Sequence, residues 1–423
     1  MSSQQPLKVV LINHADTIGG ASVVTTRLMR ALREEGVDAH MIVYTKTLDD
    51  DHIVTLSTRF RRSMMFMAEA ASGAMANGFD RKHLFEISTA SYGYDISRHP
   101  LIREADVICL NWINQGLLSI KNLRQLASLG KPIVWTMHDM WPMTGVCHHA
   151  RGCNNFTHGC GNCPQLYGRK GPNDRSAVVN ARKKRLYDMG NFTFVPVSHW
   201  LAEQAGRSSL LAGRPMEVIP NAFPIDFYIT EPTHLVQSFN IDYSKNLIVM
   251  GASRLDDPVK GLDHAVDALN YLFDCRPDVA NNALAVFYGS IREQSKLSRL
   301  RFPYRFVDRV NDPKMLRQLF ASAKVVLSSS LVETLPGTLI EGQAGGAIPV
   351  SFDNGGQYDI IDHKKSGYLA PVGDYKELAR GIVWALETDV DRQYLHDEVD
   401  KKFNASVVAH RYIDLFNRLL DKK

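Results

Sequence analysis

The chain has 423 residues, a length that suits two large domains or three smaller ones, and 45% of its residues are hydrophobic. Charged residues make up 22%, so the chain has ample core material and too little charge for an intrinsically disordered protein. The net charge of +4 is far below that of a dedicated nucleic-acid-binding protein, which excludes nucleic acid as an expected partner. No stretch approaches the roughly 18 consecutive apolar residues of a spanning helix, and residues 1–7 lack a secretory signal pattern, so we expect a cytoplasmic protein.

Basic residues are concentrated in the first half of the chain. Residues 151–200 contain eight Lys or Arg and two Asp or Glu, including the basic run 182–185, and the Arg-rich segment 59–62 precedes the apolar run 64–67. Such patches suit peripheral contact with an anionic membrane, on its inner face, or with a phosphorylated acceptor. A solvated helix face explains them equally well.

Short β-rich runs alternate with helical patterns in the first half. Residues 8–12 form such a run, and after a Gly-rich turn the apolar residues of 23–32 recur at helical spacing. Three further runs each end in a polar residue: 107–110 before Asn111, 132–137 before His138, and 192–197 before Ser198. Polar residues at strand ends line the ligand crevice of a parallel sheet, so a βαβ arrangement with a site at that edge is predicted.

A second sheet is predicted after residues 221–245, which lack an apolar period and indicate a linker. Helical stretches are predicted at 261–273 and 313–322. They separate strand candidates at 246–252, 284–288, 324–327 and 347–351. A final amphipathic helix has a predicted burial face of Tyr412, Leu415, Phe416, Leu419 and Leu420. The sequence therefore predicts an α/β protein with two Rossmann-like units.

The segment 328–350 has the features of a diphosphate site. Pro336 and Gly337 mark a helix start, where free N–H groups and the helix dipole attract phosphate. Glu341, about one turn further on, could accept both hydrogens of a vicinal diol such as ribose, and Glu333 precedes the helix on a loop. A helix charge and an unrelated surface carboxylate would explain the bare pair as well.

Two cations lie close together in the segment 251–261. Arg254 follows a strand candidate and Lys260 precedes a helical stretch, so both can project into one crevice. A guanidinium and an ammonium are suited to a diphosphate leaving group when no metal neutralises it. Taken alone, both would be interpreted as solvated loop cations.

Together these motifs resemble the family-four retaining glycosyltransferases of the GT-B superfamily, in the branch that makes bacterial polysaccharides. In chain order the resemblance rests on Gly19-Gly20-Ala21, His138-Asp139, Ile219-Pro220-Asn221, the pair Arg254 and Lys260, and the pair Glu333 and Glu341. It implies a GT-B fold, with two Rossmann-like domains facing each other across a cleft and a C-terminal helix that crosses back. The expected domains are 1–230 on the acceptor side with a Cys-rich insert at 147–163, 231–400 for the nucleotide sugar, and 401–423 for the helix that packs on the first domain.

The same resemblance implies roles for particular residues. The implied catalytic residues are Glu333, His138, Arg254 and Lys260. The implied donor-binding residues are Gly19, Gly20, Arg254, Lys260, Gly337, Thr338, Leu339 and Glu341. Arg254 and Lys260 would neutralise the diphosphate, Glu341 would bind ribose, Glu333 would bind hydroxyls of the donor sugar, and His138 would reach the sugar near the reacting carbon. Residues 334–337 and Asn111 depart from the commoner family pattern, which affects the expected sugar and acceptor more than the reaction.

The implied reaction moves a hexosyl group from a nucleotide diphosphate sugar to a glycan or lipid-linked acceptor, with retention and without a catalytic metal. Cell-envelope or capsular polysaccharide assembly is the expected setting. A sugar-nucleotide epimerase or hydrolase of GT-B shape and a non-catalytic nucleotide-sugar binder are the alternatives. The chain contains no Walker A, G-x-G-x-x-G, H-E-x-x-H or G-x-S-x-G pattern, which argues against kinase, dehydrogenase, zincin and α/β-hydrolase activities.

Four of the six cysteines fall within 17 residues, and glycines and three histidines lie around them. These four are Cys147, Cys153, Cys160 and Cys163. A short loop of this kind has no core of its own, so a structural zinc ion would supply folding energy. Two disulfides and free or redox-linked thiols are the open alternatives, and a cytoplasmic location disfavours disulfides. Cys109 and Cys275 are expected to be ordinary buried thiols.

Overall fold

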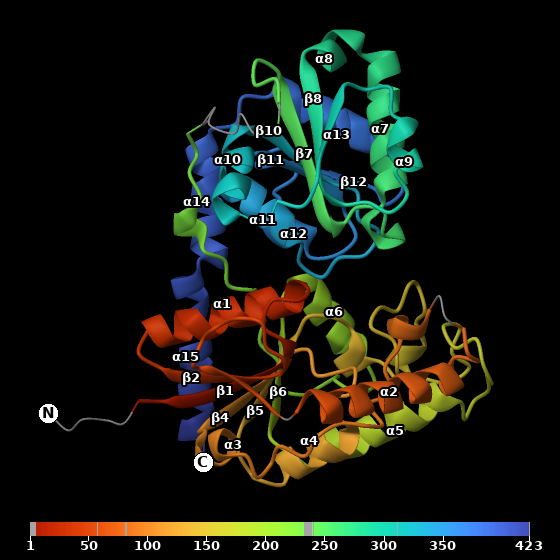
Figure 1. Ribbon diagram of the computed structural model, residues 1–423, viewed down its shortest axis with the longest axis vertical. Coiled ribbons are helices and arrows are strands. Elements are labelled where there is room, and N and C mark those ends of the chain that lie inside the picture. Colours follow the sequence, from red (N-terminus) through yellow and green to blue (C-terminus); the bar gives the residue numbers. More distant parts are fainter. Residues whose placement is uncertain are drawn as a thin grey trace, which may run out of the picture. The chain divides into compact units, whose positions relative to one another are not determined.

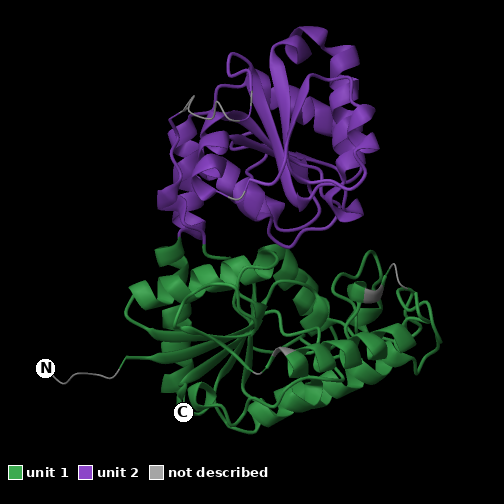
Figure 2. Cartoon of the chain, viewed as in Figure 1, with its two compact units in different colours: residues 1–222, 405–423 green, residues 223–404 purple. Residues whose placement is uncertain are grey.

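The computed structural model describes residues 6–56, 58–80, 83–231, 239, 241–310 and 312–422. The chain forms two compact units, coloured separately in Figure 2. Unit 1 comprises Met1–Ala222 with Ala405–Lys423, and unit 2 comprises Phe223–Asn404. The expected boundaries, 230/231 and 400/401, lie eight and four residues from these positions.

The segment 221–245 was predicted to be a linker, and this is wrong for its first part. Phe223 and Ile225 are buried, and the N–H of Phe223 donates to the carbonyl of Phe403 at 2.8 Å. A short 3-10 turn, η4 (Ile225–Phe227), follows. These residues therefore belong to the packed part of unit 2. The sequence did not indicate this, because their apolar side chains follow no periodic pattern. Residues 232–238 and 240 of the predicted linker lie outside the described residues.

Unit 1 is built on a six-stranded parallel sheet with the order β3-β2-β1-β4-β5-β6 (Figure 1). Its strands are β1 (Lys8–Ala15), β2 (Asp38–Thr45), β3 (Ile53–Thr55), β4 (Val107–Leu110), β5 (Ile133–Met137) and β6 (Phe192–Pro196). β4, β5 and β6 are buried along their whole length, as expected for apolar runs in a sheet covered on both faces. Its helices are α1 (Gly20–Glu34), α2 (Arg59–Ala76), α3 (Pro100–Glu104), α4 (Ile120–Ala127), α5 (Arg175–Tyr187), α6 (His199–Arg207) and α15 (Ala405–Asp421).

The last helix, α15, packs into the core of unit 1 with the face that the sequence predicts. Tyr412, Leu415 and Phe416 are buried against strand and α1 residues, and Leu419 and Leu420 are partly buried beside them. The Tyr412 hydroxyl lies 2.9 Å from the hydroxyl of Thr136 in β5, which satisfies both buried groups. The amphipathic pattern of this helix therefore returns the end of the chain to the first sheet.

Unit 2 repeats the same topology with the order β12-β11-β10-β7-β8-β9, again parallel (Figure 1). Its strands are β7 (Asn246–Arg254), β8 (Ala283–Ser290), β9 (Tyr304–Val307), β10 (Ala323–Ser328), β11 (Ile348–Phe352) and β12 (Tyr368–Ala370). Its helices are α7 (Leu262–Cys275), α8 (Pro277–Asn281), α9 (Ser295–Ser298), α10 (Pro313–Ser322), α11 (Gly337–Ala344), α12 (Gln357–Ile360), α13 (Tyr375–Glu387) and α14 (Arg392–Phe403). The predicted α/β class with two Rossmann-like units is confirmed. No helix in the described ranges combines the length and apolar character that crossing a membrane requires.

Candidate active site

Each sheet has one point at which its strand order reverses, between β1 and β4 in unit 1 and between β7 and β10 in unit 2. Ligands of such sheets bind beyond the carboxyl ends of the strands at this point. Gly19 lies on the loop after β1, Arg254 is the last residue of β7, and Glu333 lies on the loop after β10. The predicted residues therefore gather at the ligand-binding edge of their own sheet.

Arg254 is held at the end of β7 by two carboxylates that the sequence did not single out. Its Nη2 lies 2.9 Å from Oδ2 of Asp257, and its Nε lies 3.8 Å from Oδ1 of Asp256. Asp256 also accepts the N–H groups of Arg292 and Glu293, at 2.9 and 3.0 Å. Burial acts to raise the pKa of Asp256, but these N–H groups and Arg254 together hold it below its usual value. Asp256 is thus a fixed anion that orients the guanidinium.

Lys260 and Glu333 form one ion pair, although 73 positions separate them. Lys260 ends the 3-10 turn η6 (Pro258–Lys260), and its Nζ lies 2.6 Å from Oε1 of Glu333. Burial acts to lower the pKa of Lys260, but Glu333 and then Asp257 more than offset this, so its pKa is raised and the ammonium stays charged. The structure thus joins the predicted diphosphate cation to the predicted sugar-binding carboxylate.

Gly261 makes this pairing sterically possible. It has a φ of +65°, and a Cβ at this position would lie 2.0 Å from the carbonyl oxygen of Ser329. The Ser329 hydroxyl in turn donates to the carbonyl of Gly261 at 2.9 Å. Only glycine lets the turn after Lys260 approach the loop after β10 this closely.

We expect Gly261→Ala to destabilise unit 2 by more than about 3 kcal/mol, because it combines left-handed strain with a clash against backbone. Gly373→Ala is the matched control: Gly373 has a φ of +79° but no atom within 4 Å of its would-be Cβ, so only the conformational cost of about 1–2 kcal/mol should remain. Urea unfolding of both variants measures the difference. Equal losses would show that the approach to Ser329 is not tight.

Helix α11 presents the N-terminus that was predicted to hold a diphosphate. No side chain caps it, its first turn carries no acidic residue, and Pro336 is the N-cap. Backbone atoms are all that Gly337 can offer, and a Cβ there would lie 3.0 Å from the ring of Phe223. The side chain of Leu339 is buried and its N–H donates to the carbonyl of Pro336 at 3.2 Å, so the free part of this turn is at Gly337 and Thr338.

Glu341 lies in α11, near the ring of Tyr288 in β8. Burial, and then the charge of Glu341, raise the pKa of the Tyr288 hydroxyl. The Tyr288 ring covers Gly251, where a Cβ would lie 1.9 Å from the ring carbon Cζ. The glycine that opens the segment 251–261 is therefore required by packing against this tyrosine.

In unit 1, Gly19 and Gly20 form the turn from β1 into α1. Gly19 has a φ of +89°, which favours glycine, and it is the N-cap of α1, with no side chain capping the helix. At Gly20 a Cβ would meet no atom within 4 Å, so internal packing does not explain this glycine. The role of Gly20 in the approach of a ligand to this backbone stays a prediction.

His138 directly follows β5 and is half-buried. Its Nε2 lies 3.0 Å from Oδ1 of Asn111, the polar residue that follows β4. Burial lowers the pKa of His138 to about 4, against an opposing effect of Asp139, so the ring is neutral near pH 7. Two residues predicted separately at strand ends are thus brought into contact.

Asp139, the residue after His138, is the centre of a buried hydrogen-bond network that the sequence did not reveal. Its Oδ2 accepts from Trp112 Nε1 at 2.9 Å and lies 2.6 Å from His148 Nδ1, and its Oδ1 accepts the N–H of Trp141 at 2.8 Å. Burial acts to raise the pKa of Asp139, but His148 and the other partners hold it at about 2. The Nε2 of His148 lies 3.1 Å from the hydroxyl of Ser88, so both ring nitrogens of His148 are engaged.

His14, near the end of β1, is a further polar group at this edge that the sequence analysis missed. Its ring stacks on Tyr44 with the centroids 4.7 Å apart, and its Nδ1 lies 3.2 Å from the carbonyl of Asn114. Burial lowers its pKa from 6.5 to about 4, opposed by that carbonyl. The sequence of β1 has no alternation that would have indicated His14, and its aromatic neighbour Tyr44 lies on another strand.

We expect acid to destabilise unit 1 through this histidine. Between pH 6.5 and about 4 the unfolded chain binds a proton at His14 that the folded chain does not, so the free energy of unfolding falls as the pH falls. His14→Gln should flatten the dependence of the melting temperature on pH in this window. The exposed His158→Gln is the control and should leave the slope unchanged; an unchanged slope in His14→Gln would contradict the assignment.

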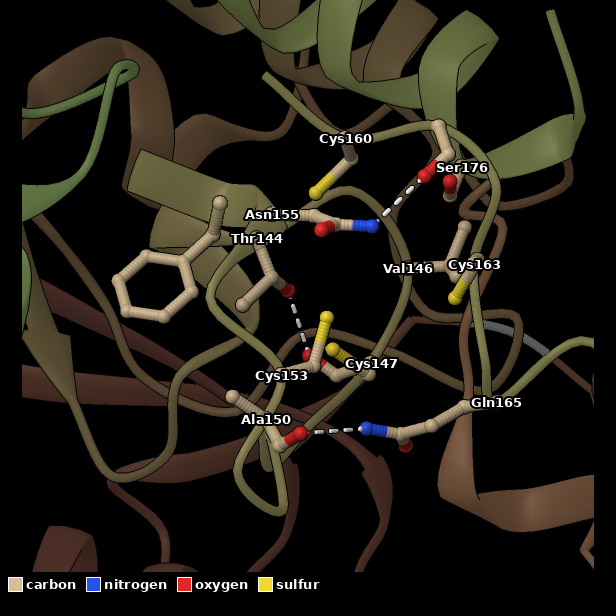
Figure 3. A pocket seen from close by; sticks show the side chains of 12 residues that line it. Thr144, Val146, Cys147, Ala150, Cys153, Asn155, Cys160, Cys163, Gln165 and Ser176 are labelled. Carbon is tan, nitrogen blue, oxygen red and sulfur yellow. Dashed lines mark hydrogen bonds between the residues drawn. The ribbon is translucent and has the colours of Figure 1, made fainter. Parts of the chain in front are cut away.

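All six cysteines are described, and all are free thiols. Cys147, Cys153, Cys160 and Cys163 line one cavity in unit 1 (Figure 3). Burial raises the pKa of Cys147 to about 12 and that of Cys160 to about 11. Within the described ranges no group of three or more His, Cys, Asp or Glu side chains is already spaced to hold a metal ion. Cys109 is buried as expected, but Cys275 is exposed at the end of α7, where the prediction of burial is wrong.

The basic runs of the sequence are not uniform surface patches. Lys183, within the run 182–185, is fully buried in α5. In α2, Arg62 donates to the carbonyl of Tyr44, while Phe60 and Met67 are 75% and 59% exposed. The side chain of Arg59 lies outside the described residues. Because Lys183 is buried, the run 182–185 contributes fewer surface charges than its four basic residues indicate.

Two Rossmann-like units of this topology form the GT-B fold, and solved structures agree with this. Anabaena HepE in complex with UDP and glucose is 16% identical over 97% of this chain and 99% of that one, with a TM-score of 0.63. Sucrose-phosphate synthase from Thermosynechococcus elongatus is 16% identical over 99% of this chain and 100% of that one, with a TM-score of 0.66.

Sequence comparisons identify the family. The family model "Glycosyltransferase Family 4" matches residues 18–227, and "Glycosyl transferases group 1" matches residues 245–388. The chain belongs to the family-four glycosyltransferases. The putative colanic acid biosynthesis glycosyl transferase WcaC of Escherichia coli K12 is 32% identical over 92 residues, 21% of this chain and 22% of that protein. Phosphatidyl-myo-inositol mannosyltransferase of Mycobacterium leprae is 28% identical over 177 residues, 41% and 46% of the two chains. The matched region thus spans less than half of each of these relatives.

Proposed function

We propose that this protein transfers a glycosyl group from a nucleotide diphosphate sugar to an acceptor hydroxyl, with retention at the anomeric carbon. The observation that carries the proposal is the arrangement at the carboxyl edge of β7 and β10. There the Lys260–Glu333 ion pair, the fixed Arg254 and the uncapped N-terminus of α11 gather in one unit. These groups supply positive charge for a diphosphate and a carboxylate for sugar hydroxyls.

The reaction follows from where charge develops. As the glycosidic bond stretches, positive charge grows on the sugar and negative charge on the departing diphosphate. Arg254, Lys260 and the N–H groups of α11 stabilise the diphosphate, and because they are held before the donor binds, they lower the barrier selectively. Two side-chain cations suffice for this role, so the proposal includes no catalytic metal.

The proposal gives the remaining predicted residues the following roles. Glu341 would bind the ribose and Glu333 the sugar hydroxyls, and in unit 1 the backbone of Gly19 and Gly20 and the neutral ring of His138 would contact the donor. A neutral imidazole can accept a hydrogen bond from a sugar hydroxyl, which an imidazolium cannot.

The relatives support a place in cell-envelope or capsular polysaccharide assembly, on a glycan or lipid-linked acceptor. One relative is named for colanic acid biosynthesis and another for a phosphatidyl-inositol acceptor. Solved structures of HepE contain UDP or UDP-glucose, which supports a nucleotide sugar as donor. The exposed Phe60 and Met67 of α2 are suited to peripheral contact with the inner face of the membrane.

Product analysis tests the proposal. A panel of nucleotide sugars is first screened for thermal stabilisation of the protein, and the best donor is then incubated with and without a glycan or lipid-linked acceptor. A transferase gives only slow hydrolysis without acceptor and a retained anomeric configuration with it. Full conversion of the donor without acceptor would instead identify an epimerase or hydrolase of the same fold.

A further inference from the structure

Four cysteine side chains from the segment 147–163 converge on a single small cavity of unit 1, as Figure 3 shows. The cavity has a volume of about 10 Å³, which is room for roughly one water-sized atom. It is also lined by Thr144, Val146, Ala150, Asn155, Phe156, Gly161, Gln165 and Ser176. This volume corresponds to the size of a single ion.

Sulfur atoms dominate the donors that this cavity offers to a metal. No histidine, aspartate or glutamate lines it, and the neighbouring His148 already uses both ring nitrogens, on Asp139 and Ser88. Four thiolates are a donor set that selects a soft or borderline metal in tetrahedral geometry, and Zn²⁺ is the usual occupant of such structural sites.

The surrounding backbone is arranged as the outer shell of a thiolate site. The N–H of Gly145 donates to Sγ of Cys160 at 3.1 Å. A Cβ at Gly145 would lie 2.5 Å from the Ser176 carbonyl and 2.9 Å from Cβ of Cys160, so a larger residue would force this N–H away. Hydrogen bonds to a ligating sulfur favour its anionic form and fix its orientation.

A buried lysine next to the cysteines provides a second, independent observation. Lys183 is fully buried, its Nζ donates to the carbonyl of Thr144 at 3.0 Å and to that of Trp141, and it lies 3.3 Å from the centroid of the Trp141 ring. Burial lowers the pKa of Lys183 well below its usual value, and the neighbouring Cys160, Cys147 and Asp139 act against this. Asp139 is one anionic partner for a charged Lys183, and a zinc ion with four thiolates, which carries a net charge of −2, would be a second one beside it.

We propose that Cys147, Cys153, Cys160 and Cys163 bind one structural Zn²⁺ ion and that Lys183 compensates part of the negative charge of this centre. Each thiol loses one proton, so binding releases four protons and changes no oxidation state. Among the described residues no group of three or more such side chains has the arrangement of a metal site, so binding would require the thiols to move to Zn–S distances of about 2.3 Å. Gly152 and Gly159, with φ of +81° and +116°, directly precede the half-buried Cys153 and Cys160.

The ion would stabilise the part of unit 1 that supports His138. The segment that carries the cysteines also carries His148, which contacts Asp139, and Lys183 contacts the carbonyls of Trp141 and Thr144. The proposal does not depend on the transferase reaction, since it concerns folding energy that the metal supplies to a loop without a core of its own.

Metal content and thiol counting of the full-length protein test the proposal together. Protein purified under reducing conditions without chelator should contain one zinc per chain by mass spectrometry. In a second preparation, purified without reductant and denatured with chelator, all six cysteines should react with a thiol reagent. If only Cys109 and Cys275 react, the cluster forms two disulfides and the proposal is overturned; zinc-free protein that also fails to take up Co²⁺ overturns it as well.

Matched variants separate the ligands from cysteines elsewhere. Cys153→Ser and Cys160→Ser should lose the zinc and the thiolate-to-cobalt absorption of the Co²⁺ form, while the exposed Cys275→Ser should keep both. Lys183→Met keeps the size of the side chain and removes its charge, so folded protein should hold zinc about 10- to 100-fold more weakly in competition with a chelator. Unchanged zinc affinity in Lys183→Met would show that Lys183 serves packing alone.

Discussion

Arg254→Ala should lower kcat/KM on the order of 100- to 1,000-fold, a loss of roughly 3–4 kcal/mol in the barrier, because it removes a preorganised donor at the leaving group. The structural reason is the way this guanidinium is held. Asp257 lies 2.9 Å away, and Asp256 is itself fixed by two backbone N–H groups. A donor fixed in advance costs little reorganisation when negative charge develops on the diphosphate.

Two further variants identify the origin of that loss. Arg254→Lys keeps the charge but lacks the fork of N–H groups, so we expect an intermediate loss. Arg299→Ala removes an exposed arginine of the same unit that pairs with Asp263 and Asp267, and it should leave turnover unchanged. Steady-state kinetics at varied donor concentration measures all three. Near-normal turnover of Arg254→Ala at saturating donor would show that Arg254 does not stabilise the leaving group.

The second large effect is expected at the ion pair of Lys260 and Glu333. Lys260→Met removes a cation and leaves the Glu333 carboxylate unpaired next to the incoming diphosphate, so kcat/KM should fall by roughly 100- to 1,000-fold. Glu333→Gln should lower turnover while leaving a cation for the diphosphate. The measurement is kcat/KM, together with the Kd of the free nucleoside diphosphate by calorimetry.

The double variant makes this prediction specific to the pair. In Lys260→Met with Glu333→Gln the repulsive carboxylate is gone, so nucleoside diphosphate binding should recover relative to Lys260→Met alone, while turnover stays low. Residues that act as a unit give non-additive losses of this kind. Additive losses in both kcat/KM and nucleoside diphosphate binding would show that the 2.6 Å contact between Lys260 and Glu333 does not contribute to function. Melting temperatures of the three variants confirm that each is folded.

Local patterns in the sequence predicted eight of the twelve described strands, including the edge strand β6, and missed the interior strand β2 and the edge strands β3, β9 and β12. β4 was predicted with the bounds that the structure has, and the candidates for β7 and β10 fell within the observed strands because long apolar runs are buried on both faces. β3, β9 and β12 have only three or four residues at the sheet edges, and the first two residues of β9 are exposed. Strands of three or four residues are too short to show a distinctive period.

In the candidate site too, some residues could be predicted from local motifs and others could not. Arg254, Lys260, Glu333 and Glu341 were selectable because each has a characteristic place in a local motif. Asp256 and Asp257 were missed, since adjacent acidic residues on a loop resemble any solvated turn. The burial of Lys183 inside a basic run could not be predicted either, because its partners, the carbonyls of Trp141 and Thr144, lie about 40 residues earlier in the chain.

The α/β class, the duplicated Rossmann-like units and the family could be predicted from the sequence, since hydrophobic periodicity and short motifs depend on neighbouring residues. The pairing of Lys260 with Glu333, the contact of Asn111 with His138 and the shared cavity of the four cysteines could be seen in the folded chain alone. These contacts join residues brought together when separate strands and loops pack, and their geometry depends on the whole sheet edge. Local sequence patterns do not show which distant residues will come into contact.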